Sequence, residues 1–210
     1  MRSRRHVLFA LAGAVACFSL AYFSLAGSAS AQSGSASQFI RQLAEQALQV
    51  MRSTQTPLDA REAQFRALLS QGFDLDFISR FVLGRNWQSA TAEQRTTYQQ
   101  LYSEYVLKVY SSRFGGYSGE SFNVVSERAA GQQDVMVQTR IDRPGGGPIQ
   151  AEWRVRVSGQ PKIIDVMVEG VSMAATQRSE FATIVKNSGV EGLINMLDAR
   201  TNKVPATAAR

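Results

Sequence analysis

The stretch Ile149-Gln150-Ala151-Glu152-Trp153-Arg154-Val155-Arg156-Val157 alternates apolar and polar residues without interruption. Successive side chains of a β-strand point to opposite faces of a sheet, so this alternation predicts a strand with one buried face and one solvated face. A strand of this kind is typical of an antiparallel sheet that is covered on one side only. The stretch therefore predicts such a sheet at the centre of the domain.

Three neighbouring segments extend the predicted sheet. Residues 122–127, 135–141 and 162–169 also favour strands, and the turns between them contain Gly131 and the run Pro144-Gly145-Gly146-Gly147-Pro148. Because these turns are short, we expect the strands to pair in sequence order as a meander.

Helical periodicity dominates the sequence on both sides of these strands. Apolar residues recur at three- and four-residue steps over 37–53 and 58–72, and a short helix is expected between Asp74, as its N-cap, and Gly84. We expect Trp87 in a loop. Thr91-Ala92-Glu93-Gln94 is a capping-box pattern and predicts the start of the longest helix, which should end at Gly115-Gly116. Two more helices, separated at Gly189, should follow the strands. We predict an α+β domain, with an antiparallel four- or five-stranded sheet packed against several helices.

The N-terminus has the three parts of a secretory signal peptide: three arginines before residue 6, an apolar stretch over 7–25, and the small-residue pattern Ala29-Ser30-Ala31. We expect residues 1–31 to be removed, although a retained membrane anchor is the alternative reading. Ser3-Arg4-Arg5-His6-Val7-Leu8 resembles a twin-arginine signal, and the general secretory route is equally compatible with it. Residues 32–37 should form a linker, 38–200 a single domain and 201–210 a polar tail.

Cleavage at this point would remove the only cysteine, Cys17, and the only histidine, His6. The mature domain of about 180 residues is long enough for its own core, but it would have no disulfide, no thiolate nucleophile and no Cys/His metal site. Its formal net charge would fall from +6 to +3, because Arg2, Arg4 and Arg5 leave and no acidic residue does. The mature part shows no basic block interleaved with aromatic residues, so nucleic acid is not an expected partner.

A set of segments distributed over nearly the whole mature chain resembles the MlaC family, also called toluene-tolerance auxiliary proteins. The most specific block is Asp165-Val166-Met167-Val168-Glu169-Gly170-Val171-Ser172. The other matching segments are Gly72-Phe73-Asp74, Phe81-Val82-Leu83-Gly84-Arg85-Asn86-Trp87, Glu93-Gln94, Tyr110, Tyr117-Ser118-Gly119-Glu120, Trp153-Arg154-Val155, Ile163-Ile164, Arg178, Phe181 and Gly189-Val190-Glu191-Gly192-Leu193-Ile194. Gln160-Pro161-Lys162 departs from the family pattern, in which an aromatic residue usually precedes the lysine.

The resemblance implies a periplasmic phospholipid carrier rather than an enzyme, with no cofactor and no metal. It implies two partners besides phospholipid: an outer-membrane lipoprotein complex and an inner-membrane ABC transporter with a substrate-binding ring. The exchange of lipid between them would maintain outer-membrane lipid asymmetry. It further implies that the lipid tails lie in an apolar cavity between the sheet and the helices.

We expect one wall of this cavity on the sheet and one on the longest helix. The candidate lining residues are Val135, Val137, Trp153, Val155, Ile164, Val166 and Val168 on the strands, and Tyr98, Tyr102, Tyr105, Val106 and Val109 on the helix. A buried tyrosine hydroxyl needs a hydrogen-bond partner or a wet rim, which suits a pocket with a polar mouth. The same residues would equally form a filled core, and periodicity alone favours that simpler reading.

Three other functions remain open at this point. The chain could carry another membrane lipid, such as a hopanoid, or act as a scaffold with a filled core. A small cone-fold enzyme would need Asp165 or Glu169 as an acid/base directed into the apolar cavity with a raised pKa. If Asp165 instead lies in a turn and its carboxylate accepts hydrogen bonds from backbone N–H groups, the enzyme reading fails. Arg154 and Arg156 are expected on the solvated face, where they could meet a lipid phosphate or an acidic partner.

Overall fold

The computed structural model describes residues 28–111 and 119–203. Helices precede and follow a single antiparallel sheet, as the sequence predicts. The elements are α1 (Ser28–Arg52), α2 (Leu58–Gly72), α3 (Leu75–Leu83), α4 (Asn86–Ser89), α5 (Ala92–Ser111), β1 (Ser121–Ala129), β2 (Asp134–Asp142), β3 (Ile149–Arg156), β4 (Lys162–Val168), β5 (Val171–Ser172) and α6 (Met173–Lys203).

The five strands pair in sequence order, β1-β2-β3-β4-β5, and each neighbouring pair of strands is antiparallel. Val155 of β3 lies between Val135 of β2 and Ile163 of β4, and Trp153 lies between Val137 and Val166. The alternation that predicted β3 is therefore confirmed, and it gives the central strands a continuous apolar face.

Register shifts modify the predicted pattern at two places. In β4 the pairing with β3 shifts between Arg154 and Val155, so Ile163 and not Ile164 lies opposite Val155 on the apolar face. The expectation that Ile164 shares that face with Val166 is wrong, because a bulge moves a strand's side chains out of strict alternation. In β1 the pairing with β2 skips Val125, which is 57% exposed.

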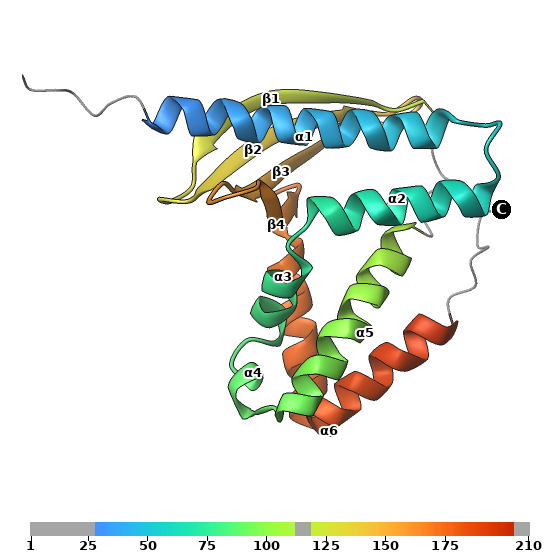
Figure 1. Cartoon of the computed structure of the whole chain (residues 1–210), viewed down its shortest axis with the longest axis vertical. Coiled ribbons are helices and arrows are strands. Elements are labelled where there is room, and N and C mark those ends of the chain that lie inside the picture. The colour runs from blue at the N-terminus through green and yellow to red at the C-terminus, as the bar shows by residue number, and fades with distance from the viewer. Residues whose placement is uncertain (1–27, 112–118, 204–210) are drawn as a thin grey trace, which may run out of the picture.

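Helix α1 covers β1 and β2 (Figure 1). Its buried residues Ala36 and Ile40 pack into the apolar face of the sheet. The Ser37 backbone N–H and hydroxyl both donate to the carboxylate of Glu127 on β1. Because α1 begins at Ser28, residues 32–37 are helical, where the sequence indicated a linker.

Helices α3, α5 and α6 extend away from the sheet as a separate packed layer, and α2 lies between them and α1 (Figure 1). The core of this layer includes Tyr98, Tyr102, Phe181, Leu193 and Leu197, all of which are 0–2% exposed. Helix α5 packs against α2, α3 and α6. The expectation that α5 faces the sheet directly is therefore wrong, because α5 buries its apolar row against other helices.

The predicted helix boundaries are confirmed where local chemistry sets them. Asp74 accepts from the Phe77 N–H at the start of α3, and Thr91 and Gln94 make the reciprocal hydrogen bonds of a capping box at the start of α5. The two C-terminal helices are continuous apart from a break at Gly189, whose φ of 70° suits glycine. Trp87, expected in a loop, lies in the one-turn helix α4. The predicted end of α5 at Gly115-Gly116 lies outside the described residues, and so do residues 204–210 of the predicted polar tail.

Candidate functional site

The apolar residues of the described chain form two clusters. The sheet cluster contains five of the predicted lining residues: Val135, Val137, Trp153, Val155 and Val166. The helix cluster contains four: Tyr98, Tyr102, Tyr105 and Val106. Phe73, which joins α2 to α3, packs against both. The structure therefore places the two predicted walls in different clusters that meet at Phe73.

Burial divides the twelve predicted residues into two groups. Six are less than 9% exposed and fill cores: Tyr98, Tyr102, Val135, Val137, Val155 and Ile164. The other six remain half-buried: Tyr105, Val106, Val109, Trp153, Val166 and Val168. A closely packed core leaves little surface on its residues, so only the half-buried group has apolar area to offer to a ligand.

Helix α2 adds a third apolar surface that the sequence analysis did not assign to the site. Phe65, Leu68 and Leu69 form its apolar row, and all three are half-buried; Gly72 is its only buried residue. A Cβ atom at Gly72 would lie 2.7 Å from a δ-carbon of Leu43, so glycine allows α2 to approach α1 closely. The helix also packs against α5 and β4. The row of apolar residues was visible in the sequence, but its incomplete burial was not.

The candidate site thus consists of half-buried apolar side chains on α2, α5 and the sheet. They are Phe65, Leu68 and Leu69 of α2, Tyr105, Val106 and Val109 of α5, and Trp153, Val166 and Val168 of the sheet. Phe73 packs against both clusters, and these contain Tyr105 and Val106 on one side and Trp153 and Val166 on the other. Such side chains offer apolar contacts to a ligand.

Trp153 is fixed in place by polar contacts at its edge. Its indole N–H donates to the Thr139 hydroxyl at 2.8 Å, and that hydroxyl donates to the Ala151 carbonyl at 3.1 Å. The Phe122 ring lies 6.0 Å from the Trp153 ring, centroid to centroid. Thr139 is fully buried, so its hydrogen bond holds the edge of the indole against the sheet. Trp153 itself is half-buried, so part of its ring remains accessible.

The two innermost tyrosines satisfy their hydroxyl groups inside the protein, as the sequence analysis expected of buried tyrosines. Tyr98 donates to the Ser79 carbonyl at 2.9 Å, and Tyr102 donates to the Gln177 side-chain carbonyl at 2.6 Å. Burial is the largest cause that raises the pKa of both phenols well above the ordinary value of a tyrosine. Tyr102 adds to the effect on Tyr98, and Tyr110, Tyr105 and Asp165 add to the effect on Tyr102. Both rings therefore act as neutral core residues.

Alkaline pH should destabilise the protein through these two tyrosines. A raised pKa in the folded state means that their contribution to stability is complete below the unfolded pKa of about 10 and is lost as the pH rises above it. We expect the free energy of unfolding to be constant with respect to these groups up to about pH 10. Above that it should fall by about 1.4 kcal/mol per pH unit for each tyrosine. Urea unfolding measured from pH 9 to 12 tests this, and Tyr98→Phe should reduce the slope; an unchanged slope would contradict the assignment.

The two carboxylates considered for acid/base chemistry are engaged in structural hydrogen bonds. Asp165 accepts from the backbone N–H groups of Val166 and Ala174, at 2.8 and 3.1 Å, and from the Ser172 hydroxyl at 2.6 Å. It thereby connects β4 to the start of α6. This is the capping role that the sequence analysis set against an acid/base role, although Asp165 lies on a strand and not in a turn.

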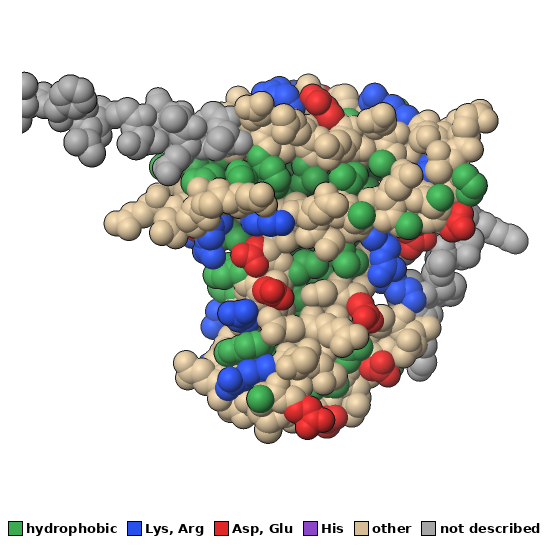
Figure 2. Space-filling view, in the orientation of Figure 1, with side chains coloured by type: hydrophobic (Ala, Val, Ile, Leu, Met, Phe, Trp, Pro, Cys, Tyr) green, Lys and Arg blue, Asp and Glu red, His purple; other side chains and the backbone are tan. Residues whose placement is uncertain are grey.

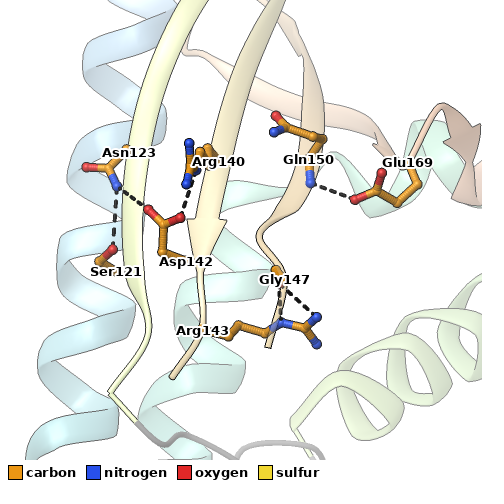
Figure 3. A network of polar contacts seen from close by, with 8 residues as sticks. All are labelled: Ser121, Asn123, Arg140, Asp142, Arg143, Gly147, Gln150 and Glu169. Atoms are coloured by element: carbon orange, nitrogen blue, oxygen red, sulfur yellow. Dashed lines mark hydrogen bonds and ion pairs between the residues drawn. The ribbon is translucent and has the colours of Figure 1, made fainter. Parts of the chain in front are cut away.

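Glu169 is exposed and lies in the tight turn between β4 and β5. Both Glu169 and Gly170 have positive φ, as a two-residue hairpin turn requires. The Glu169 carboxylate accepts from the backbone N–H of Gln150 at 2.8 Å, which Figure 3 shows beside the polar contacts of the neighbouring hairpin. Its side chain is therefore directed to the start of β3 and not into an apolar site.

Arg154 and Arg156 have a partner within the chain. Asp134, only 8% exposed, forms ion pairs with Arg154 at 2.8 Å and with Arg156 at 3.3 Å. The Arg156 guanidinium also lies 4.2 Å from the centroid of the Phe77 ring. Both arginines therefore connect β3 to β2, and Arg156 also joins the sheet to α3.

An open groove of about 400 Å³ lies where α1, the end of α2 and the turn before β4 meet. Phe39, Gln42, Leu43, Gln46, Gln71, Gly72, Gln160, Pro161 and Lys162 line it. Lys162 donates to the Gln71 carbonyl across its floor. The turn that departs from the family pattern, Gln160-Pro161-Lys162, therefore forms one side of a surface feature.

Among the described residues no three His, Cys, Asp or Glu side chains gather as a metal site would require. Within the same part of the chain, no helix combines the length and the apolar character needed to cross a bilayer.

Comparisons with known proteins agree on one family. The family model described as "MlaC protein" matches residues 41–199. The intermembrane phospholipid transport system binding protein MlaC of Haemophilus influenzae is 26% identical over 129 residues, which are 59% of this chain and 60% of that protein. The chain thus matches less than two thirds of that relative's length.

A solved structure shares the fold. The phospholipid-binding protein from Ralstonia solanacearum, solved in complex with a phospholipid, superposes with a TM-score of 0.70 at 22% identity, over 80% of this chain and 97% of that one. Together with the five-stranded meander and its helical layer, the family match shows that this chain belongs to the MlaC family.

Proposed function

We propose that the protein is a periplasmic phospholipid carrier, which moves lipid between an outer-membrane lipoprotein complex and an inner-membrane ABC transporter with a substrate-binding ring. The observation that carries the proposal is the set of apolar side chains that α2, α5 and the sheet leave half-buried, together with Phe73, which packs against both apolar clusters. Membership of the MlaC family supports phospholipid as the class of ligand and the two membrane complexes as partners.

The energetics of lipid transfer explain why such a surface is needed. Each buried methylene contributes about 0.8 kcal/mol, so a sixteen-carbon tail exposed to water costs roughly 13 kcal/mol. A soluble carrier must therefore enclose most of each tail in an apolar cavity. In this proposal α2 separates from α5 and from β4, against which it packs, to accept the tails, and the half-buried residues become the cavity wall.

The engaged carboxylates support a carrier over an enzyme. Asp165 accepts from two backbone N–H groups and the Ser172 hydroxyl, and Glu169 accepts from the Gln150 N–H in an exposed turn, so neither carboxylate is directed into an apolar cavity as the rival enzyme needs. Localisation in the periplasm rests on the predicted signal peptide, most of which lies outside the described residues.

Purified mature protein should carry about one phospholipid molecule per chain, measured by native mass spectrometry after gentle extraction. Spectra that stay lipid-free, with no uptake from phospholipid liposomes, would contradict the proposal. Identification of the extracted molecule also separates the alternatives: a polycyclic lipid would support a hopanoid carrier, and a lipid-free protein would support a scaffold.

Variants of two neighbouring α2 residues provide a matched comparison of the site. Leu68 is half-buried in the candidate surface, whereas Ala67 beside it is exposed. Leu68→Asp should lower lipid loading by about tenfold or more, because a carboxylate would lose its hydration against a lipid tail. Val106→Asp should act in the same way on α5, and Ala67→Asp should load normally. Equal loading of all three variants would mean that these residues do not line the site.

A further inference from the structure

A group of arginine and aromatic side chains on the helical layer forms a surface that the proposed lipid site does not use. It consists of Arg80 and Phe81 of α3, Trp87 of α4, Arg95 of α5 and Arg178 of α6, and we call it the arginine–aromatic surface. Figure 2 shows basic side chains alternating with hydrophobic ones over α3 and α4. Four separate elements therefore bring cations and rings together at one place.

The guanidinium groups lie against aromatic rings. Arg178 is 5.0 Å from the centroid of the Phe81 ring, and Arg80 and Arg95 are 5.6 and 5.4 Å from that of Trp87. Such stacking holds a guanidinium in place without neutralising its charge. The rings stay accessible as well, since Phe81 is 38% exposed and Trp87 is half-buried.

A glycine makes room for one of these cations. A Cβ atom at Gly84, which has a φ of 60°, would lie 2.9 Å from Nε of Arg178. The end of α3 is therefore shaped so that the Arg178 side chain lies flat across it. Fixing the side chain in this way lowers the conformational entropy that a binding partner would otherwise have to offset.

The cations of the surface lack acidic partners in the described chain. The ion pairs among the described residues involve Arg128, Arg140, Arg154 and Arg156 of the sheet. None of these ion pairs involves Arg80 or Arg178. The acidic residues nearest to these two in sequence, Asp76 and Glu180, form no ion pair with them. Arg95 differs, because it donates to the carbonyls of Trp87 and Gln88 and so holds α4 in place. Arg80 and Arg178 thus keep a forked set of N–H donors available to an external acceptor.

We propose that the arginine–aromatic surface docks an acidic surface of a partner protein, with Arg80 and Arg178 pairing with Asp or Glu side chains and Phe81 packing between them. Arginine and aromatic residues are enriched at the centres of protein interfaces and lysine is depleted there, and this surface contains no lysine. The planar fork of arginine matches a carboxylate with two parallel hydrogen bonds.

Binding to the two membrane complexes tests this inference, and the choice of these probes rests on the proposed function. Both complexes would be purified from the same organism, and their affinity for mature protein measured at physiological salt. The double variant Arg80→Glu with Arg178→Glu should weaken binding to at least one complex by about tenfold or more, because it places like charges opposite each other. Arg80→Lys with Arg178→Lys should weaken it less, because charge remains and the fork is lost.

A charge-matched control uses Arg41 of α1 and Lys186 of α6, two exposed cations outside this surface. Arg41→Glu with Lys186→Glu changes the net charge equally and should leave binding nearly unchanged. Equal weakening by the two double variants, or none, would overturn the inference. So would binding of the wild type to equimolar phosphatidylglycerol and phosphatidylethanolamine vesicles, but to neither complex, since the surface would then serve a membrane.

Lipid loading separates this inference from the proposed function. The Arg80/Arg178 variant should carry phospholipid as the wild type does, since neither residue belongs to the candidate lipid site. Wild type that is loaded but binds neither complex would overturn the docking inference and leave only the lipid-binding part of the proposed function standing. Wild type that binds a complex through these arginines but never carries lipid would support the docking inference and overturn the carrier proposal.

Discussion

Replacement of Val155 by aspartate should lower the free energy of unfolding by about 4 kcal/mol or more, enough to unfold a domain of ordinary stability. Val155 is fully buried between Val135 and Ile163, on a central strand of the sheet. A carboxylate there would lose its hydration and gain no partner, which is among the most costly changes a core can receive. Urea unfolding followed by circular dichroism measures the effect.

The exposed bulge of β1 supplies the matched control. Val125 is 57% exposed, so Val125→Asp should change the free energy of unfolding by less than about 0.5 kcal/mol. Val155→Thr keeps the shape of the side chain but replaces a methyl group by a hydroxyl. Its loss in the free energy of unfolding should lie between those of Val155→Asp and Val125→Asp. If Val155→Asp unfolds at the same urea concentration as Val125→Asp, then Val155 is not part of a filled core. The prediction that Val155 lines a pocket would then be supported.

Removal of the Asp165 carboxylate has the second largest expected effect. Asp165→Ala should lower the free energy of unfolding by about 3 kcal/mol, because it leaves the Ala174 and Val166 N–H groups and the Ser172 hydroxyl without their acceptor. Hydrogen bonds to a charged group contribute about 1.5–3 kcal/mol each, and part of this is recovered by water at a half-buried site. The same urea titration measures the loss.

Asp165→Asn separates the geometry of these hydrogen bonds from the charge. The amide oxygen can still accept from both N–H groups, so the expected loss is only about 1 kcal/mol. Lipid loading should be retained wherever the variant is folded. Asp165→Ala with wild-type stability would show that Asp165 does not cap α6 and would reopen the question of its chemistry.

Much of the fold could be predicted because its signals are local. The alternation over residues 149–157 identified β3, the Thr91–Gln94 pattern identified the start of α5, and Gly189 identified the break in α6. Each depends on interactions between residues that are close in sequence. One amino-acid sequence is therefore enough to predict these elements and their boundaries.

The candidate site could be predicted only in part because it depends on packing between distant segments. Nothing in the apolar row of α5 distinguishes a sheet from another helix as its partner, and the row of α2 gave no sign that it would stay half-buried. The choice of Ile163 over Ile164 depends on a register shift, which alternation cannot anticipate. As a result, Val106 and Trp153 were identified together with residues such as Val137 that fill the core.

The position of α1 against the sheet has a consequence for how the chain acquires its structure. The strands β1 to β4 pair with their neighbours in sequence, so their hairpins can close early and at a small entropic cost. The contact between Ser37 and Glu127, in contrast, joins residues ninety positions apart. During synthesis from the N-terminus, α1 is therefore made long before its partner strands exist, and its apolar side stays uncovered in the interval. A chaperone that protects the nascent chain would be needed most at this helix.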